Sequence, residues 1–310
     1  MPRIKVDKQD LVLANKGVEI RLSRDYSQLE EESMGKLREL LQPYSKASRF
    51  VETLIADPEV RANWDMADYM AVAKLHFNDH GEVHHKVVAT VAASLLKLLL
   101  DSDVQPDVVS SGAGDADDAF LAVVAASLLH DIGNQVHREG HMAMSVVLAI
   151  PILDRLLADF YPEIEQRIEI RGFILHAIRT HDIDVRPLTM EAAIVAVADA
   201  CDMTKGRSRY ALDMGSISIH TIGGVSIERV VMEKGRRKPI RIRVDMVNSA
   251  GIFPVEEYLL PKINAGELAP HCELIVTTEP EQSTTDQRII YTVEMEGKRF
   301  VAKGPEDSET

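Results

Sequence analysis

Histidine is the residue type that is distributed most unevenly along this chain. Nine of the eleven histidines lie between His76 and His181. Within that stretch, the segment Leu128-Leu-His-Asp-Ile-Gly-Asn places His130 beside Asp131 where an apolar run ends. An imidazole nitrogen and a carboxylate oxygen together suit borderline metals such as Zn, Mn, Fe or Co better than Ca. The pair therefore indicates a metal site, although a hydrogen bond at a helix end explains an isolated His-Asp pair equally well.

Two segments far from this pair carry further candidate metal ligands. Upstream, His84 stands at the start of a long apolar stretch. Downstream, Asp199 follows the five apolar residues 194–198 on a predicted helix. An unpaired carboxylate on such a helix would cost on the order of several kcal/mol in lost hydration. Coordination of a metal would offset this cost, so Asp199 is also predicted to be a ligand.

With these residues in this order, the chain resembles the HD superfamily of metal-dependent phosphohydrolases. The shared pattern is a histidine, a His-Asp pair and a distant aspartate on a helical bundle, and it covers roughly residues 79–209. His84 fits the first position better than His80 or His85, because the apolar residues after it stand at the offsets usual in the family. The resemblance thus implies four ligands of one metal ion, namely His84, His130, Asp131 and Asp199.

The chain also resembles the members of this superfamily that hold two metals. Gly140-His-Met-Ala-Met-Ser is similar to their segment with a histidine at the start of a helix, and Ala177-Ile-Arg-Thr-His-Asp to their segment with a histidine at the end of one. The resemblance therefore implies His141 and His181 as ligands of a second ion, and surface histidines at helix ends are the alternative. The expected cofactor is one or two divalent ions of Mn, Fe, Co, Ni, Zn or Mg.

The resemblance implies hydrolysis of a phosphoester by metal-activated water, with a nucleotide or another small phosphorylated molecule as the substrate. The expected catalytic residues are Asp131 and Asp202, and Asp202 would relay protons or orient a ligand histidine. Basic residues that closely follow the ligand segments are expected to bind phosphate oxygens, with solvated surface charge as the alternative. These substrate-binding candidates are Arg138, Lys205 and Arg207.

Other functions remain open at this point. Some HD-fold proteins have a similar ligand order but hold two irons that activate oxygen, so a di-iron oxygenase is the alternative enzyme. A non-catalytic module that senses a nucleotide is less favoured, because a degenerate sensor is expected to lose some ligands. The HD-GYP branch, which cleaves cyclic dinucleotides, is disfavoured because residues 182–188 lack its Gly-Tyr-Pro signature.

Consecutive helices are expected to position these residues. Apolar residues at mixed spacings of three and four predict a helix at residues 26–55, and runs that are apolar nearly all round predict buried helices at 87–100 and 119–130. Further helices are expected at 66–75, 142–160, 164–180 and 189–203. Asp117 or Asp118 is expected to cap the helix at 119–130, and Gly133 to suit its termination. From about Ser216, a period of two predicts strands at 217–222, 226–232, 240–247 and 289–295, with a helix at 254–264 among them.

The predicted fold class is mostly α, an HD-type helical bundle followed by a small C-terminal α+β domain. The expected parts are an N-terminal helical extension (1–60), the HD metal-binding helical domain (61–215), the α+β domain (216–303) and a disordered tail (304–310). The α+β domain would either mediate dimerisation or restrict entry of the substrate, and a homodimer is therefore among the expected assemblies.

Composition limits the remaining possibilities. The 310 residues are 45% hydrophobic, enough for a sizeable core, and the net charge of −14 disfavours binding to extended nucleic acid. A short basic run at 234–243 is interpreted as a solvated hairpin. Apolar runs broken by Lys97 or too short to span a bilayer, and a charged N-terminus, predict a cytoplasmic protein without membrane contact. Cys201 and Cys272 are expected to be buried free thiols.

Overall fold

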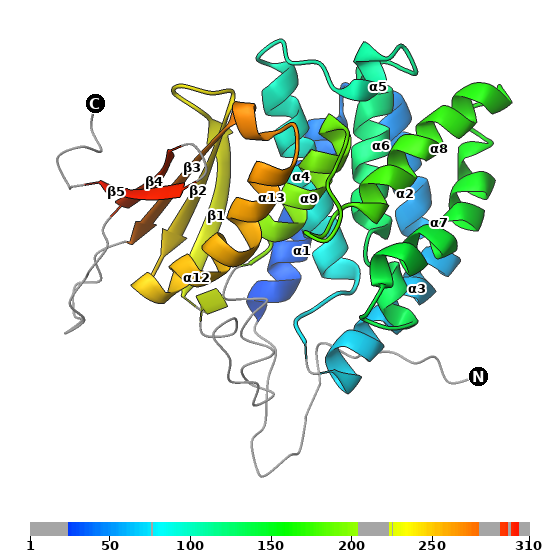
Figure 1. Ribbon diagram of the computed structural model, residues 1–310. Coiled ribbons are helices and arrows are strands. Elements are labelled where there is room, and N and C mark those ends of the chain that lie inside the picture. Colours follow the sequence, from blue (N-terminus) through cyan, green and yellow to red (C-terminus); the bar gives the residue numbers. More distant parts are fainter. Residues whose placement is uncertain are drawn as a thin grey trace.

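The computed structural model describes residues 24–75, 77–203, 223–224, 226–278, 292–296 and 299–303. A bundle of helices forms one part of the molecule, and a five-stranded sheet with short helices forms the other (Figure 1). The predicted fold class, a helical bundle followed by a small α+β unit, is therefore confirmed. The strand expected at 217–222 and the tail at 304–310 lie outside the described residues.

The bundle follows the predicted order of helices. Its longer helices are α1 (Arg24–Leu41), α2 (Ser45–Ala56), α3 (Pro58–Asp68), α4 (Glu82–Leu100), α6 (Ala116–Leu129), α7 (His141–Leu157), α8 (Ile164–Arg179) and α9 (Met190–Cys201). Three short elements join them: a π-helical turn η1 (Tyr69–Lys74), α5 (Asp107–Ser110) and a 3₁₀ turn η2 (Ile132–Gln135). The segment predicted as one helix at 26–55 is thus two helices.

Aspartate caps explain why two helices begin before their predicted first residues. The side chain of Asp57 accepts hydrogen bonds from the backbone of the first turn of α3, and Pro58 suits the first helical position. The pair therefore begins a helix at 58, well before the predicted 66. At α6 the cap is Asp115, not Asp117 or Asp118, and Asp118 completes a capping box by accepting from the backbone of Asp115.

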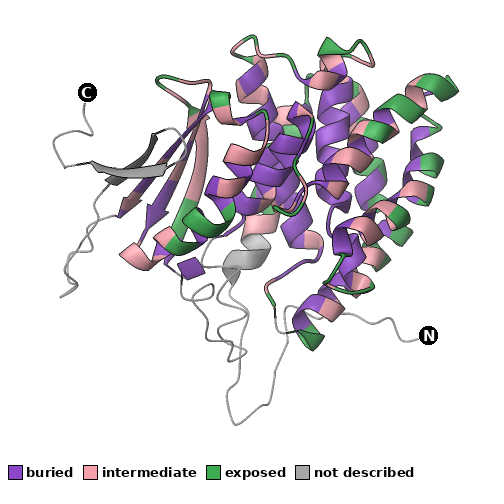
Figure 2. Ribbon diagram, in the orientation of Figure 1, coloured by how far each residue is buried: buried purple, intermediate pink, exposed green. Residues whose placement is uncertain are grey.

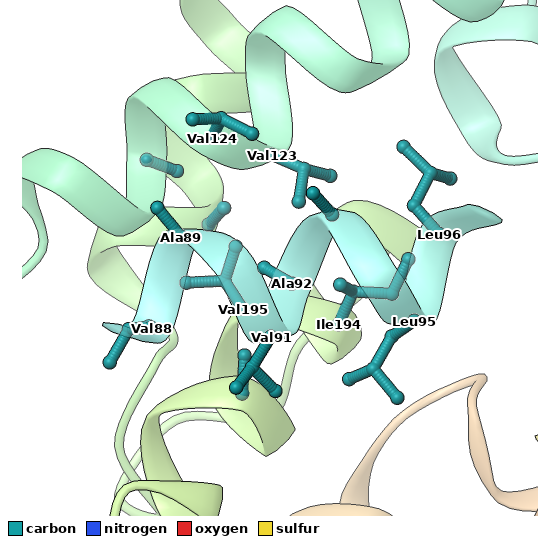
Figure 3. Close-up of a cluster of buried hydrophobic side chains, with 14 of the residues drawn as sticks. Val88, Ala89, Val91, Ala92, Leu95, Leu96, Val123, Val124, Ile194 and Val195 are labelled. Atoms are coloured by element: carbon teal, nitrogen blue, oxygen red, sulfur yellow. The ribbon is translucent and has the colours of Figure 1, made fainter. Parts of the chain in front are cut away.

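Three helices form the centre of the bundle, because they are apolar on almost every side. Every residue of α6 from Asp118 to Leu129 is buried, as is most of α4 and α9 (Figure 2). Side chains of these helices, such as Val91, Val123 and Ile194, gather in one cluster (Figure 3). Among the described residues, α4 is the helix that is long and apolar enough to cross a membrane, but 78% of its 18-residue apolar stretch is buried inside the protein.

The strands form a sheet with the order β1-β2-β3-β4-β5. They are β1 (Ile227–Lys234), β2 (Ile240–Met246), β3 (Cys272–Thr278), β4 (Thr292–Glu296) and β5 (Arg299–Lys303). Strands β2 and β3 are parallel, and the other neighbours are antiparallel. The basic run at 234–243 forms the β1–β2 hairpin, as expected, but it is not wholly solvated, because Arg241 is 13% exposed and pairs with Glu273. Neither β3 nor β5 was predicted.

A crossover connects the parallel strands β2 and β3, as parallel pairing requires. It consists of η3 (Ser249–Gly251), α12 (Ile252–Pro254), the π-helical turn η4 (Val255–Leu259), α13 (Leu260–Ala265) and η5 (Ala269–His271). Both η4 and α13 pack against α9 between the sheet and the bundle (Figure 1). The approach is close, because a Cβ at Gly266 would lie 2.6 Å from the Cβ of Ala193. The crossover therefore brings residues of the C-terminal unit next to the helix that carries Asp199.

Candidate metal centre

The six predicted metal ligands come from the ends of five different helices and meet in one place. They lie in the first turn of α4, at and just after the end of α6, at the start of α7, just after α8 and in the last turn of α9. Five of them are almost fully buried, and Asp199 is partly exposed. Three sets of three residues could each hold a metal ion, because their ligand atoms lie within 4.8 Å of one another, and one of these sets includes His80 in addition to predicted ligands.

Three ligands form what we call the first group: His84, His130 and Asp199. The Nε2 atoms of the two histidines are 3.1 Å apart, and Oδ1 of Asp199 lies 3.3 and 3.6 Å from them. Ligand atoms that share an ion at about 2.1 Å lie roughly 3.0–3.4 Å apart, depending on the coordination geometry. The distances between the ligand atoms of the first group are therefore close to those found around a bound ion.

The second group consists of His141 and His181, and Asp131 faces both groups. The Nε2 atoms of His141 and His181 are 3.2 Å apart and lie 3.1 and 3.4 Å from Oδ1 of Asp131. The other oxygen, Oδ2, lies 3.7 and 3.6 Å from the histidine Nε2 atoms of the first group. Oδ1 is buried but accepts no hydrogen bond from the described residues. One carboxylate could thus bridge two ions.

The Nδ1 atom of each histidine has a partner that can only accept a hydrogen bond. In His130, His141 and His181 it donates to a backbone carbonyl oxygen at 2.7–3.0 Å, and in His84 it lies 2.6 Å from Oδ2 of Asp202. The Nδ1 atom therefore carries the proton, and in a neutral ring Nε2 presents a lone pair. Within each group two such lone pairs face each other. A cation between them relieves the repulsion, and these residues fit a metal ion for that reason.

Electrostatics favour the protonation states that metal binding needs. Burial lowers the pKa of His130, which keeps the ring neutral near pH 7. Burial would raise the pKa of Asp131, but the nearby His130 and His80 outweigh burial and hold that pKa well below its usual range. Both acids of the cluster are therefore ionised near pH 7, since Asp199 shows the same balance with Lys262 as the main opposing charge.

Two further side chains lie against the candidate ligands. Asp202 lies against His84, so of the two expected roles the structure supports orientation of a ligand histidine. His80, which ranked behind His84 for the first ligand position, has its Nδ1 2.6 Å from Oδ2 of Asp131. It also belongs, with His84 and Asp131, to one of the sets that could hold a metal. A histidine four residues before a ligand was the available signal.

Lys262 is the residue at the site that the sequence analysis missed entirely. Its Nζ donates a hydrogen bond of 2.7 Å to Oδ2 of Asp199, and the residue is 4% exposed. It belongs to α13 in the C-terminal unit, 63 residues from its partner. The segment around it contains no motif, so only the crossover packing reveals the pair. The argument that Asp199 would lack any counter-charge without metal was therefore wrong.

Of the predicted phosphate-binding residues, the structure describes Arg138. Its Nη1 lies 3.3 Å from Nε2 of His141 and 3.9 Å from Oδ1 of Asp131, beside the second group. Lys205 and Arg207 lie outside the described residues. Cys201 and Cys272 are buried and free, as expected.

The comparisons with known proteins found one relative that is itself uncharacterized. The uncharacterized protein MJ1020 of Methanocaldococcus jannaschii is 37% identical to this chain over 236 residues, which make up 76% of the chain and 91% of that protein. No protein-family model and no solved structure matches the chain. The buried histidine and aspartate cluster is compatible with an HD-type site, and its geometry carries the functional argument.

Proposed function

We propose that this chain, which belongs to the same family as MJ1020, is a metal-dependent phosphohydrolase that acts on a nucleotide or another small phosphoester. The observation that carries the proposal is the pairing of histidine lone pairs around Asp131. In both groups two Nε2 atoms face each other at 3.1–3.2 Å, and the two oxygens of Asp131 face the two groups. Such an arrangement supports one or two divalent ions.

Each residue of the cluster has a distinct task in this proposal. His84, His130 and Asp199 would hold one ion, His141 and His181 a second, and Asp131 would contact both. Bound divalent ions lower the pKa of water and neutralise charge on phosphoryl oxygens. Asp202 fixes the tautomer of His84, and His80 orients Asp131 through its hydrogen bond of 2.6 Å. Arg138, beside the second group, is suited to binding a phosphate oxygen.

The first prediction tests this proposal by removing the shared carboxylate. Asp131→Asn should bind less than about one tenth of the manganese bound by the unchanged protein and lose phosphohydrolase activity, because both groups lose an anionic ligand. The protein is stripped of metal, reloaded with Mn, Mg, Co or Ni, and screened against phosphorylated metabolites. Metal content is measured by mass spectrometry of the digested protein.

The control replaces an acid outside the cluster. Asp101, exposed at the far end of α4 and paired with Lys97, can be changed to Asn and should leave metal content and activity intact. Activity and metal that both survive in Asp131→Asn would exclude the assignment. A protein purified with two irons that consumes oxygen and hydrolyses no phosphoester would instead support the oxygenase alternative.

A further inference from the structure

Among the described residues, the cluster is more exposed to solvent on one side, which we call its opening. The side chains of His84 and His130 are 0% exposed, and those of the second group are 2% and 4% exposed. Exposure rises at Asp199, and it is greater still at Asp182 and Arg138. Arg138 and Asp182 lie together there, with side-chain atoms 3.9 Å apart. Among the described residues, Asp199, Asp182 and Arg138 therefore form the most exposed edge of the cluster.

The crossover of the C-terminal unit forms one wall of this opening. Lys262 contributes the hydrogen bond to Asp199 from α13. Tyr258 precedes it by four residues in η4, and it lies near enough to Asp182 and Arg138 for their charges to act on its hydroxyl group. The opening is thus bounded by the bundle on one side and by the β2–β3 crossover on the other.

Two cations lie beside the cluster, one at each group. Arg138 lies beside the second group, and Lys262 lies beside the first. The rest of the protein is strongly acidic, with a net charge of −14, so it repels an anionic substrate at long range. A pair of cations next to the ions would provide the local attraction that the whole surface lacks. Phosphoryl groups have several oxygens, and two cations on different sides can bind them together.

We propose that Lys262 of the C-terminal unit binds the phosphoryl group of the substrate, opposite Arg138 of the bundle. This inference rests on the proposed function. The ammonium group has three N–H donors, and the described residues take up one of them, at Asp199. The bond to Asp199 holds Nζ at the first group, and the remaining donors serve phosphoryl oxygens. The active site is therefore completed by the α+β unit.

A purely structural role would make Lys262 an anchor between α13 and α9. An anchor contributes to the free energy of unfolding, but it has no effect on the affinity of the folded, metal-loaded protein for phosphate. The two roles therefore predict different phosphate affinities for metal-loaded protein that lacks the Lys262 ammonium group.

The test compares Lys262→Met with Lys238→Met. Lys238 belongs to the same unit, but its ammonium donates to the backbone carbonyls of Ala269 and Cys272, away from the cluster. Binding of inorganic phosphate to the manganese-loaded proteins is measured by calorimetry, together with manganese affinity, KM and kcat. We expect Lys262→Met to weaken phosphate binding and raise KM by roughly 10- to 100-fold, the loss typical of a charged hydrogen bond. Lys238→Met should change neither, and Lys262→Arg should restore part of the loss.

The outcomes separate this inference from the proposed function. Unchanged phosphate affinity and KM in a metal-loaded Lys262→Met protein would overturn the inference while leaving hydrolysis intact. Phosphate binding that depends on Lys262 in a protein that cleaves no phosphoester would support the inference and contradict hydrolysis. If Lys262→Met does not fold, Lys262→Gln, which keeps a hydrogen-bond donor for Asp199 but no charge, provides the same comparison.

Discussion

At the scale of single residues, the order of motifs predicted which side chains meet. His84, the His130-Asp131 pair and Asp199 lie far apart in the chain, yet the structure brings their ligand atoms together. Residues without a motif could not be found in this way. Lys262 is one lysine among many, and its place beside Asp199 depends on the path of the crossover. Short motifs therefore predict ligands, whereas long-range packing determines the charges around them.

Asp202 allows a second prediction at this scale. Asp202→Asn keeps the size of the side chain but removes the acceptor-only partner of Nδ1 of His84. The ring can then adopt the other tautomer, which places a proton on Nε2 and blocks metal binding at the first group. We expect manganese affinity to fall by roughly 10- to 100-fold, as for other residues that orient a ligand histidine. Isothermal titration calorimetry with Mn measures this affinity.

Asp245 provides the matched control for Asp202. It is buried in β2 and pairs with Arg229 and Arg243, away from the cluster. Asp245→Asn should lower stability without changing manganese affinity. Equal affinity in Asp202→Asn and the unchanged protein would show that His84 is held by other contacts.

At the scale of elements, helix existence could be predicted but some helix starts and strand pairings could not. Periodicity identified the long helices, whereas the first turn of α3 lacks a distinct apolar face and is set by the Asp57 cap. The pairing of β2 with β3 is a long-range contact across the whole crossover, and no local pattern encodes it. The role of Gly133 also could not be predicted from local sequence. It was expected to end α6, but it lies in η2 against α7.

The third prediction concerns the contact between Gly133 and α7. A Cβ at Gly133 would clash with the backbone of His141 and Ser145, while the Gly133 N–H donates to Oγ of Ser145. Gly133→Ala should therefore push the start of α7 away and move His141 from Asp131. We expect a loss of roughly 1–3 kcal/mol in the free energy of unfolding and preferential loss of the second metal ion. Denaturant titration and metal content measure the two effects.

Gly172 provides a control of the same chemical change. It lies inside α8, and a Cβ there would meet no atom within 4 Å. Gly172→Ala should stabilise the protein by roughly 0.5–1 kcal/mol, because alanine favours helix, and metal content should stay unchanged. Similar effects of the two substitutions would contradict the close packing at η2.

At the scale of the whole molecule, stability should depend on pH through a buried acid remote from the metal site. Glu191 in the first turn of α9 is fully buried, and its Oε1 accepts a hydrogen bond of 2.7 Å from the backbone of Val108. Its other oxygen has no hydrogen-bond partner among the described residues. Burial raises the pKa of Glu191 to about 7. The folded protein therefore holds a proton that the unfolded chain releases at lower pH.

The fourth prediction follows from the sign of this shift. The pKa of Glu191 is higher in the folded protein than in the unfolded chain. The stability that protonated Glu191 contributes is therefore fully present below pH 4.5 and is lost as the pH rises through about 7. At about 1.4 kcal/mol per pKa unit, the unfolding free energy should fall by about 3 kcal/mol across that range. Urea titrations of the metal-free protein at several pH values measure it. Glu191→Gln should lack this component, and an identical pH dependence in both proteins would refute it.

The distance in sequence between Asp199 and Lys262 also has a consequence for the timing of synthesis. The bundle helices that carry the metal ligands are complete when residue 201 has been added, but the lysine follows 63 residues after Asp199. At about 5–20 residues per second, the ribosome needs roughly 3–13 s to reach it. If both proposals hold, a nascent bundle would present its metal ligands before it has its full phosphate site. The order of translation would thus keep an early, metal-loaded intermediate from acting efficiently on cellular phosphoesters.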